Sequence, residues 1–224
     1  MSRCILIYGQ PGVGKSYSLR NLDPNSTVII DADKKGMLPW RGSRKAYNKD
    51  NRNFFSTSSL DSILKTVRTI GNSDDWKQFK VLVIDGLNNA MISEIMFYNE
   101  LHNTSNNFEK WNEVAAKTYK IIDLAQNLRN DLTVIFVAHV KTADPYAPTD
   151  VDKVFTPGKQ LENTIKVESK FNYVFYAKCE DGDFFFETLP NRSTARSPYE
   201  CFEDKVPNDA AQIISIIENY EEGE

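Results

Sequence analysis

The chain has 224 residues, of which 41% are hydrophobic and 26% charged, and its formal net charge is −4. This balance excludes a disordered chain and is typical of a globular protein long enough to bury a substantial core. No apolar run approaches the roughly 20 residues of a membrane-spanning helix, and the short N-terminal run leads directly into a Gly-rich loop instead of a signal-peptide cleavage site. We therefore expect a cytoplasmic protein with no membrane partner.

Three widely spaced cysteines and two histidines lack the spacing of a zinc site, and scattered cysteines are typical of a reducing compartment. Charge is uneven along the chain. Residues 34–53 carry seven Lys or Arg and one acid, whereas the 25 residues from Glu200 onward carry eight acids and one Lys. Nucleic-acid-binding proteins often combine a basic patch with an acidic tail, although two ordinary solvated faces would give the same composition.

Short apolar runs alternate with helical patterns over the first 139 residues. The pattern predicts strands at 4–8, 27–31, 80–85 and 132–139, and helices at 15–22, 58–72 and 108–130. In the second helix we expect Gly71 to act as the stop signal. In the third, one apolar face is expected to hold Phe108, Trp111, Ala115, Ile122 and Ala125. Unbroken apolar strands between helices predict an α/β fold with a mostly parallel central sheet flanked by helices.

The pattern changes beyond residue 170. Two aromatic-rich runs, at 171–178 and 184–189, flank an Asp-Gly pair, which predicts a C-terminal β-hairpin. A terminal helix follows, capped by either Asn208 or Asp209. The chain contains no internal repeat and no linker rich in Pro, Gly or Ser, so we predict a single domain over residues 1–224.

The stretch GQPGVGKS, residues 9–16, matches the phosphate-binding pattern G-x-x-x-x-G-K-[ST] and lies between a predicted strand and a predicted helix. Glycines let backbone N–H groups turn inward around phosphates, Lys15 can reach the β- and γ-phosphates, and the Ser16 hydroxyl can ligate Mg²⁺. The positive end of the following helix is expected to point at the same place. The predicted nucleotide-binding residues are Gly9, Gln10, Pro11, Gly12, Val13, Gly14, Lys15, Ser16 and Tyr17.

Polar side chains end the other predicted strands. Asp85 closes the strand at 80–85, where a carboxylate beside the loop can hold Mg²⁺, so Ser16 and Asp85 are the predicted metal ligands. No Glu follows Asp85, and the group that positions the attacking water must come from elsewhere. Asp31 and Asp33 follow the second strand on the same rim, and His139 ends the strand at 132–139, where it can sense phosphate or be an ordinary strand-end residue.

Four segments, GQPGVGKS, VIIDADKKG, VLVID and VIFVAH, resemble in this order the RecA-like ATPases. The segment FFFETLPNRSTARSPYECFEDKVPND resembles the phage-encoded ATP-binding members of that superfamily, which are compact single-strand annealing or recombination ATPases. The resemblance spans residues 3 to about 210. It implies a RecA-like P-loop NTPase fold, the cofactors ATP and Mg²⁺, and the cytoplasm of a bacterial host as the location.

The resemblance also implies roles for individual residues. Asp33 occupies the place of the base that positions water, and because it is shorter than the usual Glu we expect slow hydrolysis. His139 occupies the place of the nucleotide sensor, and the loop at 140–159 the place of a DNA-binding loop. Either Arg192 or Arg196 would reach the nucleotide of a neighbouring subunit, which implies a homo-oligomer, either a ring or a filament. The catalytic set is then Lys15, Asp33, Asp85, His139, Arg192 and Arg196.

Residues 34–53 are a second candidate for binding single-stranded DNA. Basic residues there alternate with Trp40 and Tyr47, and Phe54 and Phe55 follow. Single-strand binders pair a positive track with aromatic rings on which bases stack, although these rings can equally be core residues. We therefore expect a slow, DNA-stimulated ATPase that binds single-stranded DNA in phage recombination, annealing or replication. The alternatives are a nucleotide-gated helicase loader or regulator, and a nucleotide kinase in which the segment NRSTARSP would act as a lid.

Overall fold

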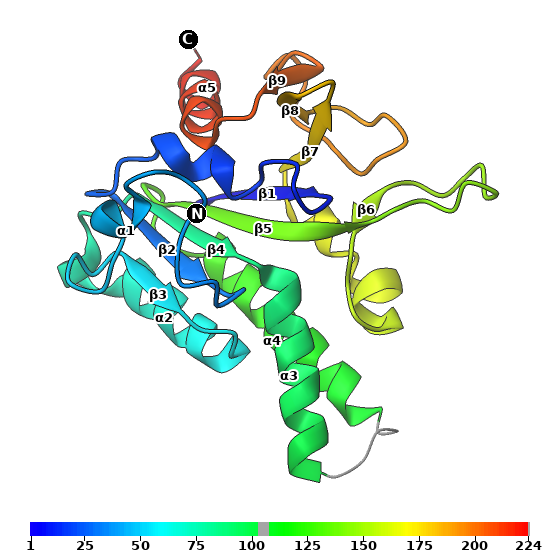
Figure 1. Cartoon of the computed structure of the whole chain (residues 1–224), viewed down its shortest axis with the longest axis horizontal. Coiled ribbons are helices and arrows are strands. Elements are labelled where there is room, and N and C mark those ends of the chain that lie inside the picture. Colours follow the sequence, from blue (N-terminus) through cyan, green and yellow to red (C-terminus); the bar gives the residue numbers. More distant parts are fainter. Residues whose placement is uncertain (103–107, 224) are drawn as a thin grey trace.

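The computed structural model describes residues 1–102 and 108–223. Nine strands form the central sheet in the order β3-β2-β4-β5-β1-β7-β8-β9, and β6 pairs with the end of β5 (Figure 1). Neighbouring strands are parallel from β3 to β7, whereas the β5–β6, β7–β8 and β8–β9 pairs are antiparallel. The strands are β1 (Arg3–Gly9), β2 (Thr27–Asp31), β3 (Phe54–Ser56), β4 (Val81–Asp85), β5 (Thr133–Lys141), β6 (Lys153–Val154), β7 (Tyr173–Glu180), β8 (Asp183–Glu187) and β9 (Lys205–Pro207).

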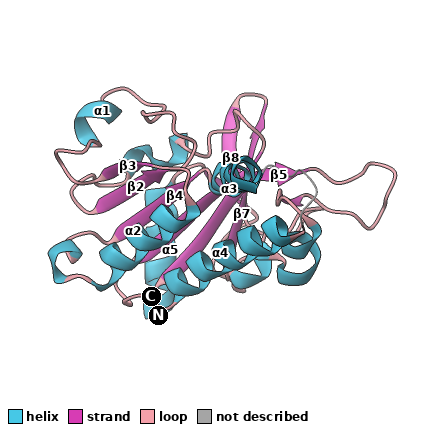
Figure 2. Ribbon diagram, turned by 90° about the horizontal axis from the view of Figure 1, so that it is seen from below, coloured by secondary structure: helices cyan, strands magenta, loops and turns pink. Residues whose placement is uncertain are grey.

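Helices cover both faces of this sheet. The α-helices are α1 (Ser43–Ala46), α2 (Leu60–Asn72), α3 (Leu87–His102), α4 (Glu109–Gln126) and α5 (Ala210–Glu222). Short helical turns occupy Tyr17–Asn21 (η1), Asp74–Trp76 (η2), Gln160–Ile165 (η3) and Val167–Lys170 (η4). Helices α2 and α4 lie side by side across the same face of the strands (Figure 2). Within the described residues, no helix is long and apolar enough to span a bilayer.

The two faces of β1 belong to two different hydrophobic cores. Leu6 and Tyr8 are buried with side chains of α2, α3 and α4. Ile5 and Ile7 are buried on the opposite face with residues of η1 and α5. Because both faces are covered, the strand is apolar at every position from Cys4 to Tyr8 instead of alternating. The predicted fold, a mostly parallel sheet flanked by helices with a C-terminal hairpin and helix, is confirmed.

The sheet register aligns the ends of four parallel strands. Gly9 pairs with His139, and Asp31 pairs with Asp85. All four residues therefore lie at the carboxyl edge of the sheet, which is where open parallel sheets bind their ligands.

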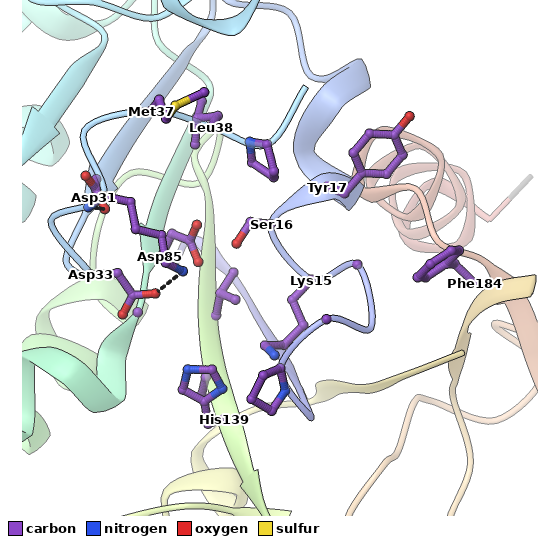
Figure 3. Close-up of a pocket in the computed structure, with 18 residues that line it drawn as sticks. Lys15, Ser16, Tyr17, Asp31, Asp33, Met37, Leu38, Asp85, His139 and Phe184 are labelled. Carbon is purple, nitrogen blue, oxygen red and sulfur yellow. Dashed lines mark hydrogen bonds and ion pairs between the residues drawn. The ribbon is translucent and has the colours of Figure 1, made fainter. Parts of the chain in front are cut away.

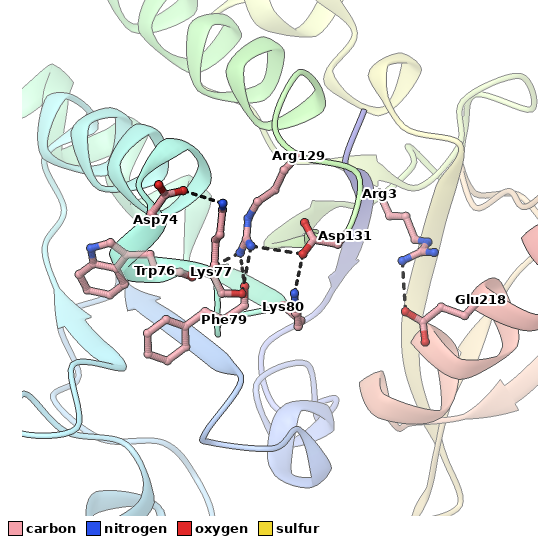
Figure 4. A network of polar contacts seen from close by, with 9 residues as sticks. All are labelled: Arg3, Asp74, Trp76, Lys77, Phe79, Lys80, Arg129, Asp131 and Glu218. Carbon is pink, nitrogen blue, oxygen red and sulfur yellow. Dashed lines mark hydrogen bonds and ion pairs between the residues drawn. The ribbon is translucent and has the colours of Figure 1, made fainter.

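Charged side chains close the opposite edge of the sheet (Figure 4). The Arg129 guanidinium, 16% exposed, donates to the main-chain carbonyls of Trp76, Lys77 and Phe79 and pairs with Asp131. Asp131 also accepts from Lys80 at 2.5 Å. Nearby, Arg3 pairs with Glu218 at 3.1 Å and with Glu221 at 2.5 Å. These two acids of the C-terminal stretch are therefore partners of β1.

Several local predictions hold. The Asp-Gly pair forms a two-residue turn between β7 and β8, with φ of +51° and +90° at its two residues, a conformation that favours glycine. Asp209, not Asn208, caps α5, because its carboxylate accepts from the backbone N–H groups of residues 211 and 212.

Other local predictions are wrong. Gly71 lies inside α2, where a Cβ would be 2.3 Å from a methyl carbon of Leu128, so this glycine allows close packing and does not end the helix. Phe108 is 83% exposed and lies outside the apolar face of α4. Helix α3 was not predicted, because its apolar residues surround the helix and show little periodicity. The loop predicted at 140–159 is shorter, since β5 extends to Lys141 and pairs with β6.

Candidate nucleotide site

A cavity of about 810 Å³ opens at the carboxyl edge of the sheet (Figure 3). Its walls come from residues 11–17, from the ends of β2, β4 and β5, from the segment 33–39 and from β8. The predicted residues Lys15, Ser16, Asp33, Asp85 and His139 all line it. The structure thus brings together residues from four separate parts of the chain.

The loop at 9–16, which we call the P-loop, is folded tightly around its own lysine. The Lys15 ammonium donates to the carbonyls of Gly9 at 2.9 Å and Gln10 at 2.6 Å. Gly12 and Gly14 have φ of +85° and +82°, which other residues adopt only with strain. Burial lowers the pKa of Lys15 to about 8, against the opposing charge of Asp85. The ammonium is therefore a desolvated cation that a bound phosphate would stabilise.

The helix expected after the loop is only a 3₁₀ turn of five residues, Tyr17–Asn21. Such a short turn has no appreciable helix dipole, so the predicted contribution of a positive helix end is wrong. The turn stays short because Leu22 is already extended and leads into Pro24. Phosphate binding must then depend on the loop N–H groups and on Lys15.

Ser16 and Asp85 form the expected metal side of the cavity. Asp85 is 6% exposed, and this burial raises its pKa to about 6, while the Ser16 hydroxyl opposes the shift. Among the described residues, no cluster of three His, Cys, Asp or Glu side chains could hold a metal. One carboxylate and one hydroxyl suit Mg²⁺, which usually binds through one or two protein oxygens together with substrate phosphates. The donor set therefore fits a metal that arrives with the nucleotide.

The two carboxylates that follow β2 have different surroundings. Asp31 is buried and accepts from the N–H groups of Lys35 and Gly36 and from the Ser56 hydroxyl. Asp31 is therefore a structural residue that fixes the turn. Asp33 faces the cavity and pairs with Lys35 at 2.6 Å.

Gly86 makes room for the Asp33 carboxylate. Its φ is +97°, and a Cβ on it would lie 2.3 Å from Asp33 Oδ1. Any side chain at position 86 would therefore displace Asp33. Sequence reasoning missed this glycine, because the two residues are 53 positions apart and only the β2–β4 pairing brings them together.

His139 lies where β5 meets the cavity. Its backbone N–H donates to the Asn88 side chain, and its carbonyl accepts from Phe155 N at 2.8 Å. Within the described part of the chain, its buried Nδ1 has no hydrogen-bond partner. Burial, reinforced by the charge of Lys15, lowers the pKa of His139. The imidazole is therefore neutral at pH 7 and can act as an acceptor or a donor inside the cavity.

The two candidate arginines lie outside the cavity lining. Arg196 donates through its guanidinium to the main-chain carbonyls of Glu168 and Phe171. This guanidinium holds its own chain together and is not free to reach another subunit. Arg192 is exposed, and its carbonyl accepts from Asp152 N at 2.8 Å.

The basic segment 34–53 is divided between core and surface. Tyr47 and Phe54 are 4% and 8% exposed and belong to the core, and Trp40 is half-buried with its ring at an edge to Tyr47. Tyr47 and Phe54 are therefore unavailable as stacking platforms for bases, and that part of the prediction is wrong. Stacking on half-buried Trp40 and Phe55 stays a prediction. The basic side chains are exposed at positions 34, 35, 41, 44, 45, 49 and 52.

The cavity also contains residues that the sequence did not indicate. Met37, Leu38 and Pro39 form one wall, and Phe184 of β8 forms another. Tyr17, Met37 and Phe184 are 44%, 47% and 45% exposed, although they are large apolar side chains. A partly apolar wall beside a phosphate loop suits the base and sugar of a nucleotide. Tyr17 belongs to the predicted nucleotide-binding residues, whereas no local pattern reveals Met37, Leu38, Pro39 and Phe184, because they come from two segments distant from the P-loop.

A phosphate loop, a buried strand-end carboxylate and a parallel sheet with helices on both faces define a nucleotide-binding protein of the P-loop NTPase class. The family model described as an AAA domain matches residues 1–202, and the chain belongs to this family. Membership places it among the P-loop ATPases.

Among solved structures, the KaiC-like protein of the hyperthermophilic archaeon Pyrococcus horikoshii is similar to the chain, with 13% sequence identity and a TM-score of 0.43. The match covers 82% of this chain and 76% of that one. A search of curated proteins finds no match.

Proposed function

We propose that the protein is a slow ATPase that uses ATP and Mg²⁺ and acts on single-stranded DNA in recombination, annealing or replication, as its resemblance to phage annealing ATPases implies. The observation that carries the ATPase proposal is the meeting of Lys15, Ser16, Asp33, Asp85 and His139 in one cavity. These side chains supply a cation for the phosphates, two metal-binding oxygens, a base and a polar sensor.

The site residues divide the reaction between them. The P-loop N–H groups and Lys15 bind the phosphates, and Lys15 leaves the carbonyls of Gly9 and Gln10 to do so. Ser16 and Asp85 would hold Mg²⁺, and the metal would neutralise charge on the phosphate oxygens. Asp33 accepts a hydrogen bond from the attacking water and orients it. Neutral His139 contacts the terminal phosphate as the nucleotide sensor. A carboxylate one methylene shorter than Glu reaches less far, which accounts for slow turnover.

The DNA part of the proposal rests on the exposed basic side chains of residues 34–52, which begin directly after Asp33. These side chains would bind phosphates of the strand, so affinity should fall steeply with salt. The loop at 142–152, which projects from the body of the molecule, is the second candidate contact (Figure 1). We further propose a homo-oligomer, a ring or a filament, in which exposed Arg192 reaches the nucleotide of a neighbouring subunit.

The test of the ATPase is hydrolysis with and without single-stranded DNA. The native protein is compared with Lys15→Ala and with Lys65→Ala, a control that removes an exposed lysine of α2 outside the cavity. We expect DNA to stimulate hydrolysis by the native protein and by the control. We expect Lys15→Ala to abolish hydrolysis with or without DNA. Turnover that ignores DNA would instead support the kinase or loader function.

The test of the DNA surface is the salt dependence of binding. Arg44→Ala and Lys45→Ala should each lower the slope of log affinity against log salt by about one, because each removes one phosphate contact. Lys65→Ala should leave the slope unchanged. Equal slopes in all four proteins would exclude the segment as the DNA site.

A further inference from the structure

A second lysine lies in the phosphate cavity besides Lys15. Lys35 lines the cavity, and its ammonium is 2.6 Å from Asp33 Oδ2, the contact drawn as a dashed line from Asp33 in Figure 3. The Lys35 ammonium is therefore paired with the Asp33 carboxylate, the group proposed to bind the attacking water. In this arrangement Asp33 cannot accept a hydrogen bond from water through that oxygen without losing or sharing its lysine.

The backbone at Lys35 is held in place, whereas its side chain is free to move. The Asp31 carboxylate accepts from Lys35 N at 3.2 Å and from Gly36 N at 2.8 Å, and Ser56 holds the same carboxylate at 3.1 Å. The Lys35 side chain is 60% exposed, whereas that of Asp33 is 11% exposed and lies against Gly86. The carboxylate is thus the fixed member of the pair, and the lysine can change partner.

The charge of Lys35 affects the other titratable groups of the phosphate site. Its charge contributes to lowering the pKa of Lys15 and of His139, and it opposes the rise in the pKa of Asp85. Burial is the largest single influence and lowers the pKa of Lys35, but the hydrogen bond to Asp33 and the charges of Asp33, Asp85 and Asp31 together raise it above its ordinary value. Lys35 is therefore a full cation beside three other groups of the phosphate site.

We infer that Lys35 is a second phosphate-binding lysine, which exchanges the Asp33 carboxylate for the terminal phosphate when ATP binds. The inference rests on the proposed ATPase function. The exchange is favourable because a terminal phosphate has more negative charge and more acceptor oxygens than a carboxylate, and a largely exposed ion pair holds its partner weakly. It also removes the lysine from Asp33 Oδ2, so that this oxygen can accept a hydrogen bond from water when a terminal phosphate is present.

ADP lacks that phosphate, so Lys35 stays on Asp33 in the ADP complex. Lys35 therefore distinguishes ATP from ADP, whereas Lys15 and the P-loop bind the phosphates that both nucleotides share. Loss of Lys35 should therefore weaken binding of ATP and not of ADP, whereas loss of a residue that only supports the fold should weaken binding of both.

The experiment measures the dissociation constants of ADP and of a non-hydrolysable ATP analogue by titration calorimetry, with Mg²⁺ present. Lys35→Met should weaken binding of the ATP analogue by about tenfold or more, the effect of losing one charge-assisted hydrogen bond, and should leave ADP binding unchanged. Lys65→Met is the matched control, because Lys65 is an exposed lysine of α2 that neither lines the cavity nor belongs to the basic segment. It should change neither constant.

Two further variants separate the possible failures. Lys35→Arg, which keeps the charge, should retain at least part of the preference for the ATP analogue over ADP, and Lys15→Ala should weaken binding of both nucleotides. Equal weakening of both nucleotides by Lys35→Met, or no weakening, overturns the inference. If Lys15→Ala binds both nucleotides as the native protein does, the proposed function itself fails.

Discussion

Replacing the buried Asp85 by Asn should stabilise the ligand-free protein at neutral pH. Burial raises the pKa of Asp85 from 3.8 to about 6, so the cost in folding free energy grows as the pH rises from 3.8 to about 6 and is complete above that. Each pKa unit is worth about 1.4 kcal/mol, which makes the cost at pH 8 roughly 3 kcal/mol at most. At pH 5 the cost falls to roughly half, and it disappears below the unfolded pKa, where both states are protonated.

The assay is urea unfolding of the native protein and Asp85→Asn at pH 8 and pH 5 without nucleotide. We expect the variant to be more stable at pH 8, and its advantage to shrink at pH 5. The control is Asp131→Asn at the opposite edge of the sheet, where the hydrogen bond from Lys80 lowers the pKa of the carboxyl. That substitution should lose a little stability, because it removes a favourable but half-exposed pair. If Asp85→Asn is no more stable than the native protein at pH 8, or if the gain in stability is equal at both pH values, Asp85 is not a buried carboxylate whose ionisation destabilises the fold.

Three other predictions concern separate parts of the molecule. Arg129→Ala leaves three main-chain carbonyls without a charged donor and should lower the free energy of unfolding by roughly 2–3 kcal/mol, measured in urea; a loss near zero would contradict the contacts in Figure 4. Gly86→Ala should displace Asp33 and lower kcat by about 100-fold, with a much smaller change in nucleotide affinity; steady-state kinetics and calorimetry separate the two effects, and an unchanged kcat would argue against Asp33 as the base. At pH 8 a thiol reagent should modify exposed Cys179 rapidly and spare Cys4, since burial raises the pKa of Cys4 to about 12; mass spectrometry of the labelled native protein would identify the modified residue.

The site residues differ in how visible they are in the sequence. Gly9, Gly14, Lys15 and Ser16 lie within eight residues and form a recognisable motif. Asp85 ends an apolar run, so a short stretch of sequence is enough to predict each of these residues. Phosphate binding requires glycines at fixed spacing, and a buried parallel strand requires an unbroken apolar run. The chemistry itself therefore imposes a local pattern.

Other features leave no such trace. The five-residue turn after the P-loop is predicted as a helix over residues 15–22, because nothing in KSYSLRNL shows that Lys15 and Ser16 stay in the loop and that residues 17–21 form a 3₁₀ turn. Tyr47 and Phe54 alternate with basic residues as stacking rings would, yet each fills the core between the segment and the sheet. Arg192 and Arg196 are equivalent in sequence, and only the carbonyls of Glu168 and Phe171 tell them apart.

The sequence by itself determined the α/β class, the P-loop and the strand-end acids, because each follows from chemistry between near neighbours in the chain. Only the tertiary structure decided which residues share the cavity. The pairing of β2 with β4 places Asp33 against Gly86, and the turn held by Asp31 directs Lys35 to Asp33. Contacts between distant segments depend on register and packing, which no local pattern of residues encodes.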